Sequence, residues 1–464
     1  MNNLYQDTNV RQDYKMKHFS ILVLAICLLF YLFFAFYDGA VIFPDSYTYI
    51  NMTIYREPFY PIFLEFCRQV FQNFGVDYLF MAVLVQSILT AVSSWSLVMY
   101  ITRKFHLHYL ISVFFLCILM STSFVWSFVE QQGGIYSNSI LSEGIVIPCY
   151  FLFFRFLLEY MDHRSKKNLF ICCLLVFVLL STRKQMVVSL FMLGICILMV
   201  FFRDKEYRKG LVIALSCMLG ILFANIILDC GYNYAVRGFF SRHSGDTRFI
   251  TTMVFYTADK TDLQMIKDEE TKRIFLDIYE TCNGKNLLKK SAGDGWVKRI
   301  SHFIDSYDDI QLHTMQPMIN KYINEDKLGY GDDGLHKRAD AIMNSVNHIL
   351  LPHNFGKIVG TIMDNFVLGL IMTVSHRRYS ILRWYSLFAY IGYILLLLYH
   401  ARRKESQDIF LFAVLVLLSI LINVGLVSMV IFCQTRYMIY NMALFYISIG
   451  LMARPVLVKI LNRD

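Results

Sequence analysis

Long apolar segments alternate with short polar connections over the first half of the chain. The apolar segments cover about residues 18–37, 79–101, 109–127, 142–158, 168–182, 186–202 and 210–229. A run of about 20 apolar residues is long enough for a helix to cross the ~30 Å hydrocarbon core of a bilayer. The pattern therefore predicts seven membrane-spanning helices before residue 230.

The composition indicates the same environment. Of the 464 residues, 56% are hydrophobic and 17% are charged, whereas a soluble protein carries about 25% charged residues. The net charge of +9 lies in short basic clusters between apolar segments, so no nucleic-acid partner is predicted. We expect an all-α polytopic membrane protein whose first partner is the lipid bilayer.

The basic clusters also predict an orientation. Polar residues 1–17 precede the first apolar segment, and the even-numbered segments are followed by "TRKFH", "EYMDHRSKKN" and "RDKEYRKG". Lys and Arg gather in cytoplasmic loops of membrane proteins. We therefore expect residues 1–17 to be cytoplasmic, residues 18–229 to form a core of seven spans, and residues 38–78 to be the first external loop.

Residues 230–356 have the composition of a water-exposed domain, which the span count places outside. Within it, one amphipathic helix over 258–282 is predicted from the helical spacing of its apolar residues, namely Leu263, Ile266, Ile274, Ile278 and Cys282. We expect this external domain to be mainly helical.

The last region, residues 357–464, admits two arrangements. If every apolar segment crosses the membrane, the chain has eleven spans, and both "ARRKES" and the C-terminus fall outside. If 357–375, which contains Lys357, Asp364 and Asn365, lies along the outer interface, the chain has ten spans and both basic segments fall inside. We prefer the interfacial arrangement, and a full crossing stays open.

Cysteine and histidine spacing predicts no metal site. Most of the 11 cysteines lie within apolar segments and lack CxxC pairs, as expected for small buried hydrophobic residues. The histidines of the external domain lack ligand-like spacing (His302, His313, His336 and His353). No cofactor is predicted, and a divalent metal has no support in the sequence.

A polar segment, "PDSYTYINMTIYREPFYP", follows the first span and is expected to be external. Pro44 resists continuation of the helix, so Asp45 stands within a residue or two of the membrane surface. The segment that follows places one set of apolar residues on one helical face (Ile62, Phe63, Phe66, Val70 and Phe71), typical of a helix lying in the interface. A purely structural role is the alternative: Asp45 would cap the helix that follows, and Arg56 and the tyrosines would anchor the chain at the membrane interface.

The combination of residues resembles the start of the glycosyltransferase-C superfamily, in particular protein O-mannosyltransferases and the aminoarabinose transferases of lipid A. The matching pattern is an Asp, a Tyr four residues later and an Arg-x-Pro-x-Tyr-Pro element (Asp45, Tyr49, Arg56, Pro58, Tyr60 and Pro61). In that superfamily an acidic residue at this place is the catalytic base, a role that the resemblance carries to Asp45. Members with Asp-Glu here have a second carboxylate, whereas Ser46 follows Asp45 in this chain.

Three further motifs follow in the order expected of this superfamily. "LSEGIVIP" contains Glu143, "LLSTRKQMVV" contains Arg183, and "CQTRYM" contains Arg436 and Tyr437. The topology places all of them outside with Asp45. The resemblance covers roughly the first 230 residues, and the remainder only in outline.

The resemblance implies transfer of a sugar from a polyprenyl phosphate to an acceptor outside the cytoplasmic membrane of a bacterium. The acceptor would be an envelope glycan, a glycolipid or a protein. Asp45 would deprotonate the acceptor hydroxyl, and direct displacement would invert the anomeric centre. Arginines bind phosphate through paired hydrogen bonds; the candidates are Arg183, Arg436 and Arg56, followed by Arg242 and Arg377.

Several roles stay open. Glu143, Tyr49 and Tyr60 are candidates for orienting the acceptor or other site residues, and Glu143 could equally cap the fourth span. A flippase or transporter of lipid-linked glycans is one alternative function, disfavoured by the near absence of ionisable residues within the spans. A non-catalytic scaffold for envelope assembly is the other.

Overall fold

The computed structural model describes residues 2–130, 133–325, 332–375, 380–403 and 406–461. Across these residues the secondary structure is helical, and the β-type pairing is limited to one parallel bridge between Val41 and Ser139. Ten of the described helices are long and apolar enough to cross a membrane. The protein is therefore an all-α multi-pass membrane protein, and the predicted fold class is confirmed.

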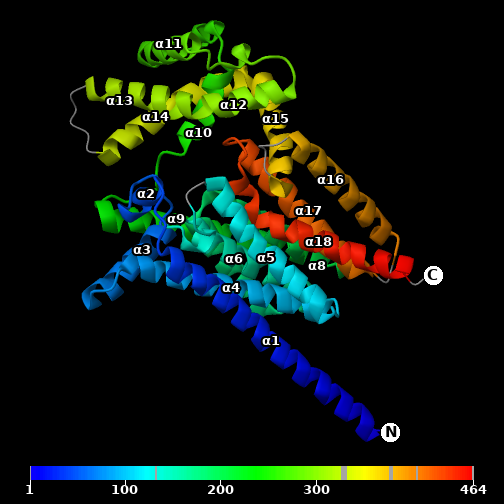
Figure 1. Ribbon diagram of the computed structural model, residues 1–464. Helices are drawn as coiled ribbons and strands as arrows, with labels where there is room; N and C mark the ends of the chain where they lie inside the picture. Colours follow the sequence, from blue (N-terminus) through cyan, green and yellow to red (C-terminus); the bar gives the residue numbers. More distant parts are fainter. Residues whose placement is uncertain (1, 131–132, 326–331, 376–379, 404–405, 462–464) are drawn as a thin grey trace.

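A bundle of long helices forms the body of the molecule (Figure 1). Its members are α1 (Asn2–Asp38), α4 (Tyr78–Lys104), α5 (Tyr109–Glu130), α6 (Glu143–His163), α7 (Lys166–Thr182), α8 (Val187–Arg203), α9 (Tyr207–Arg237), α16 (Ser380–Ala401), α17 (Gln407–Ser428) and α18 (Thr435–Leu461). Small residues line the buried face of α4, among them Ser87, Ala91 and Ser94. Such residues let neighbouring helices approach closely within a bilayer.

The two ends of the bundle differ in what they carry. At one end, which we call the Asp45 end, the first loop meets the starts of α6 and α18, since Arg436 bonds both Asp45 and Glu143. At the opposite end, Tyr100 near the end of α4 donates to Asp162 of α6, and Arg454 of α18 donates to the carbonyl of Phe105.

A layer of shorter helices covers the Asp45 end (Figure 1). It contains α10 (Thr247–Thr257), α11 (Glu269–Gly284), α12 (Trp296–Ile310), α13 (Gln316–Glu325) and α14 (Asp332–His353). A π-helical turn, Gln311–Met315, joins α12 to α13. We call this layer the external domain, a name that keeps the expectation drawn from the span count.

The prediction of one amphipathic helix over 258–282 is wrong. The chain forms a short 3₁₀ segment, Lys260–Met265, and then α11, because the Asp268 carboxylate accepts a hydrogen bond from the Thr271 amide and starts a new helix. The predicted apolar side is nevertheless buried at Ile266, Ile274 and Ile278.

Helix α15 (Phe355–Val374) joins the external domain to the bundle. Its first half contacts the external domain, where Arg299 donates to Asp364 through Nε (2.7 Å) and Nη2 (2.8 Å). From Asn365 its contacts change to the bundle, since the Asn365 amide donates to the carbonyl of Ile431 at 2.8 Å. Helix α15 qualifies as a span by length and composition, but the ten residues after Asp364 cover only about 15 Å, so its placement at the interface stays a prediction.

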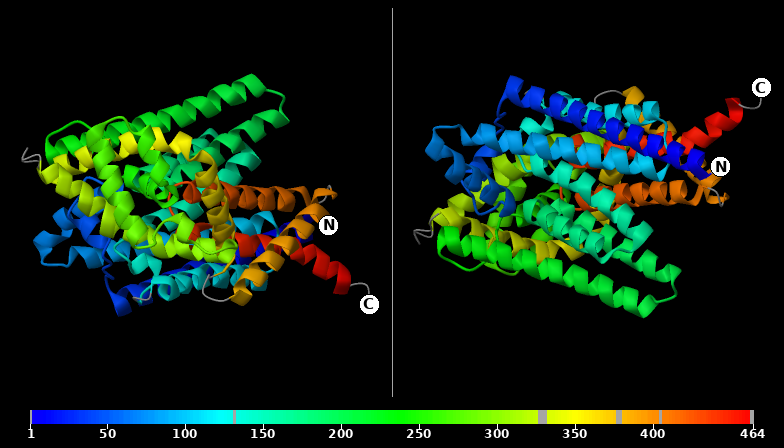
Figure 2. Two further views of the ribbon diagram at one scale, coloured as in Figure 1. Left: turned by 90° about the horizontal axis from the view of Figure 1, so that it is seen from above. Right: turned by 90° about the horizontal axis from the view of Figure 1, so that it is seen from below.

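Two other helices differ from the predicted spans. Helix α7 has 17 residues and is not among the helices counted as membrane-spanning, although it covers about 26 Å. Helix α8 is equally long, but it is counted because the 3₁₀ turn before it extends the span to Lys184–Arg203. Helix α9 continues to Arg237, eight residues past the predicted end at 229, and stops where Gly238 adopts a left-handed backbone (φ 78°). Figure 2 shows α9 at the edge of the bundle, on the side away from α1.

The first loop contains α2 (Ser46–Ile50) and α3 (Phe59–Phe71). In α3 the buried residues are Tyr60, Pro61, Leu64 and Cys67, which form a different face from the one chosen in the sequence. The chosen face is more exposed, with Phe66 at 62%. Helix α3 thus has two apolar faces, one packed against the bundle and one available to lipid.

Candidate functional site

The first loop and the start of α6 are joined by backbone pairing. The Val41 amide donates to the carbonyl of Asn138 (3.0 Å), and the Ile140 amide donates back to the carbonyl of Val41 (3.0 Å). Gln86 of α4 donates to the carbonyls of Ser137 and Ser139. These bonds hold residues 41 and 139 side by side, and so bring the segments that carry Asp45 and Glu143 together.

A glycine allows α6 to start this close to α4. A Cβ at Gly144 would lie 2.5 Å from Gln86 Cδ, a separation that real side chains do not adopt. The close packing therefore requires glycine at 144, and it fixes the position of Glu143 one residue before.

Asp45 stands at the N-terminus of α2, but its side chain makes no capping hydrogen bond. Instead its Oδ1 accepts from Arg56 Nη2 at 2.8 Å, and its Oδ2 accepts from Arg436 Nη1 at 3.1 Å. The side chain of Asp45 is 44% exposed. The carboxylate is thus held by two guanidinium groups and remains accessible.

Glu143 is fully buried at the first residue of α6. Its Oε1 accepts from Arg183 Nη1 and from Arg436 Nε, the latter at 2.5 Å. The carboxylate is therefore engaged by two arginines from distant segments. Among the described residues no hydrogen bond or ion pair joins Glu143 to Arg56, and no side-chain capping bond is found at the start of α6.

The two candidate tyrosines lie at different depths. The Tyr49 hydroxyl donates to Ser142 Oγ at 3.2 Å and accepts from Arg56 Nη1 at 3.3 Å, so Tyr49 joins the two halves of the site. The Tyr60 hydroxyl donates to Gln86 Oε1 at 2.8 Å, and its ring packs edge-on against that of Tyr49. Tyr60 is fully buried below the site and supports Tyr49 from beneath.

No protein-family model matches this chain, and no curated protein matches it.

Charge and burial together define what the site can do. Two carboxylates, Asp45 and Glu143, face three guanidinium groups, those of Arg56, Arg183 and Arg436. The cluster therefore carries an excess positive charge, which favours an anionic ligand. Burial raises the pKa of Asp45, but the charges of Arg56 and Arg436 together lower it by more than burial raises it. The resulting pKa lies below the ordinary value of an aspartate. Asp45 is thus ionised at neutral pH.

The connection between α7 and α8 is fixed to the start of α18. Gln185 donates to the carbonyl of Tyr437 at 2.6 Å and to Asn423 Oδ1 at 2.8 Å. The guanidinium of Arg183 lies 5.0 Å from the centre of the Tyr437 ring. These contacts explain why Arg183 and Arg436, which are far apart in the sequence, meet at one carboxylate.

Of the remaining arginine candidates, Arg242 is not part of this cluster. Arg242 lies near Asp229, with 3.8 Å between Nε and Oδ2, and its side chain is half exposed. It lines a separate cavity of about 240 Å³ with Glu57 and Lys184. Arg377 lies outside the described residues. Within the described residues no group of three or more His, Cys, Asp and Glu is arranged to hold a metal ion.

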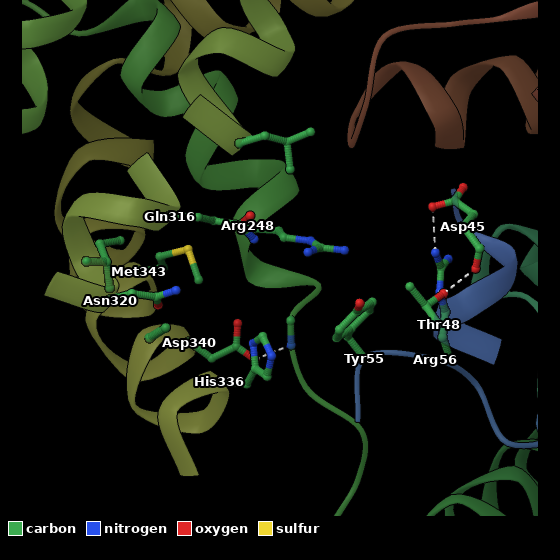
Figure 3. Close-up of a pocket in the computed structure, with 14 residues that line it drawn as sticks. Asp45, Thr48, Tyr55, Arg56, Arg248, Gln316, Asn320, His336, Asp340 and Met343 are labelled. Carbon is green, nitrogen blue, oxygen red and sulfur yellow. Dashed lines mark hydrogen bonds and ion pairs between the residues drawn. The ribbon is translucent and has the colours of Figure 1, made fainter. Parts of the chain in front are cut away.

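A cavity opens from Asp45 toward the external domain (Figure 3). It is lined partly by Arg248 and Asp340, which the sequence reasoning missed. The sequence around Arg248 and around Asp340 does not distinguish these two residues from the other charged residues in the segment 230–356. Only the docking of the external domain over the first loop brings them to the site.

Proposed function

We propose that the protein is a membrane glycosyltransferase of the glycosyltransferase-C type. It would transfer a sugar from a polyprenyl-phosphate donor to an envelope glycan, glycolipid or protein acceptor on the outer face of a bacterial cytoplasmic membrane. The observation that supports the proposal best is the arrangement of Asp45: an ionised, accessible carboxylate among arginines, at one end of a membrane bundle.

The two carboxylates take different roles in this proposal. Glu143 is fully buried and engaged by two arginines, so a substrate hydroxyl does not reach it, and it positions Arg183 and Arg436. Asp45 is 44% exposed, and each carboxylate oxygen has a second lone pair to accept a further hydrogen bond. Asp45 is therefore the candidate base.

The reaction follows from these positions. The acceptor hydroxyl gives its proton to Asp45 while its oxygen bonds to the anomeric carbon of the sugar. The bond between that carbon and the phosphate oxygen breaks, and the polyprenyl phosphate leaves with the electron pair. Arg436 and Arg183, whose side chains are 12% and 14% exposed, stabilise the charge on the leaving phosphate.

The orientation is also part of the proposal. Basic residues such as Arg103, Lys104, Lys167 and Arg203 belong to the helix ends away from Asp45. Lys and Arg are enriched in cytoplasmic loops, so the Asp45 end would face outward.

Substitution of Asp45 tests this function directly. We expect Asp45→Asn to lower sugar transfer at least ~100-fold, the usual contribution of a general base, while membrane insertion and donor-lipid binding stay nearly normal. The measurement is transfer of labelled sugar by purified protein in nanodiscs. Asp305→Asn, an exposed carboxylate on α12, is the matched control and should retain full transfer. Full transfer by the Asp45→Asn variant would refute the mechanism.

The substrates can be identified in parallel. Mass spectrometry of envelope glycans and polyprenyl-phosphate sugars, with and without the gene, should show an accumulated donor and a missing sugar. Translocation of lipid-linked sugar in liposomes, without modification of an acceptor, would instead favour a transporter.

A further inference from the structure

The cavity next to Asp45 lies between the first loop and the external domain. It has a volume of about 320 Å³, at the small end of the range for ligand pockets. The first loop contributes Asp45, Thr48, Tyr55 and Arg56. The rest of the lining comes from α10 and the residue before its cap, the π-helical turn, α13 and α14; it includes Gly245, Arg248, Leu312, Gln316, Asn320 and Asp340.

Arg248 is the notable cation in this lining. In Figure 3 its guanidinium extends across the cavity toward the side that carries Asp45 and Arg56. It stacks 5.0 Å from the centre of the Tyr55 ring. Its Nε is buried and has no hydrogen-bond partner, and no ion pair among the described residues includes it. Arg56, Arg183 and Arg436 differ in this respect, since each of them pairs with a carboxylate.

Arg248 is partly buried, with its Nε fully buried, and a guanidinium that loses part of its hydration without gaining a carboxylate partner is destabilised. Burial, together with the positive charge of Arg56, lowers the pKa of Arg248. An anionic group of a ligand in the cavity would remove this cost.

The external-domain wall, which faces Asp45, also offers an acceptor. Asp340 Oδ2 accepts from the Gly245 amide at 2.5 Å, but its Oδ1 is buried without a partner. The amide side chains of Gln316 and Asn320 line the same wall (Figure 3). The cavity thus presents both donors and acceptors, which suits the hydroxyl groups of a sugar, and buried polar groups without partners call for such an explanation.

The backbone near this wall is also unusual. Residues 311–315 form a π-helical turn that places Leu312 in the lining, with Gln316 directly after it. Such turns are rare and occur frequently at functional sites.

We propose that this cavity binds the acceptor, and that the acceptor is a carbohydrate carrying a carboxylate or another anionic group, which Arg248 holds. The proposal rests on the proposed function, because that function makes Asp45 the group that meets the acceptor hydroxyl. Among the described residues, the lining outside the first loop belongs to the external-domain side, and none of it comes from a bundle helix. The cavity therefore suits a water-soluble glycan chain better than the lipid-linked donor.

Binding measurements on the full chain in nanodiscs test the proposal without requiring transfer. The probes are glucuronic, galacturonic and mannuronic acids and their neutral parent hexoses, compared by ligand-observed NMR titration. We expect at least one acid to bind about tenfold more tightly than its neutral parent, the usual scale of one charge-assisted hydrogen bond. Arg248→Gln should abolish this preference, and Arg248→Lys should restore part of it.

The matched control is Arg338→Gln. Arg338 belongs to α14 and pairs with Glu270 at 3.2 Å, and it is not among the lining residues. This variant should keep the full preference for the acid. Gel filtration and thermal unfolding of each variant establish that the fold is retained.

Two results would overturn the proposal. The first is a wild-type protein that binds no acid more tightly than its neutral parent. The second is an Arg248→Gln variant that keeps the preference but binds a short prenyl phosphate more weakly, which would assign Arg248 to the donor. Binding is measured apart from transfer, so the two proposals can fail separately. If the wild-type protein binds an acid more tightly than its neutral parent and the Asp45→Asn variant keeps full transfer, only the proposed function is refuted.

Discussion

Glu143 holds the candidate site together from beneath. One buried carboxylate pairs with both Arg183 and Arg436, which belong to segments far apart in the chain. Removing one member of a buried ion pair leaves the other charge uncompensated, at a cost of about 3–5 kcal/mol. Glu143 is thus expected to matter more for stability than any exposed carboxylate of the first loop.

Glu143→Gln should therefore lower the free energy of unfolding by about 3–5 kcal/mol, with a marked fall in the melting temperature measured in detergent. Glu65→Gln provides the control, because Glu65 pairs with Arg68 on the exposed side of α3 and such pairs often contribute nothing measurable. Equal melting temperatures for the two variants would rule out this role of Glu143.

The pH dependence of transfer follows from the partners of Asp45. Its pKa lies below the ordinary 3.8 because, despite burial, Arg56 and Arg436 stabilise the ionised form. The stability that this ionised form contributes is present above pH ~3.8 and is lost as the pH falls through the lowered pKa. Because its pKa is lowered, Asp45 should remain ionised, and therefore able to accept a proton, in mild acid.

Arg56→Gln removes one of these two charges, so the pKa of Asp45 should rise. The acid limb of the kcat/KM profile should then move to higher pH, as a pH–rate series would record. Arg68→Gln, on the exposed side of α3, should leave the limb in place. An acid limb unchanged by Arg56→Gln would show that Asp45 is not the titrating group.

At the scale of single residues, the sequence predicted which candidates share one end of the molecule, and it did so by counting spans. Asp45, Arg56, Glu143, Arg183 and Arg436 do lie together. The pairing pattern was not predictable, because it depends on which side chains meet across the bundle. Arg248 was missed for the same reason, since an unpaired cation is recognised only from its surroundings.

At the scale of helices, hydrophobic patterning located the bundle helices well and their ends less well. Polar residues that form helix caps, such as Asp268, divide an apolar pattern that reads as continuous. Asp364, which argued against a span at 357–375, is paired with Arg299 of the external domain, and the interfacial placement of α15 stays a prediction. The error at 258–282 arises because periodicity records burial and does not record where a helix cap interrupts the chain.

At the scale of the whole molecule, α15 and α16 together lead the chain once from the Asp45 end of the bundle to the opposite end. Helix α15 begins at the external domain. The end of α16 and the start of α17 lie away from Asp45, as His400 of α16 contacts the carbonyl of Met452 and Asp408 lines a cavity with Arg103. The start of α18 lies at the Asp45 end. Positions 429 and 167 should therefore lie on opposite faces of the membrane.

Cysteine labelling checks this arrangement together with the proposed orientation. Met429 is 56% exposed between α17 and α18, and Lys167 is exposed near the start of α7. A membrane-impermeant maleimide should label Met429→Cys in intact cells, and Lys167→Cys only in inverted vesicles. The exposed native Cys117 is replaced by Ser in both. Labelling of both positions from one side would contradict the arrangement, and the reverse pattern would contradict the orientation.

The ion pair between Asp45 and Arg436 joins residues 391 positions apart. During synthesis, all the residues between them are added before Arg436, so Glu143 and Arg183 first lie in the membrane without their third partner. A chain that ends before α18 would insert most of its helices and yet lack the site. Completion of the last helix is therefore the step at which the protein becomes competent, and quality control that monitors this helix would detect incomplete molecules.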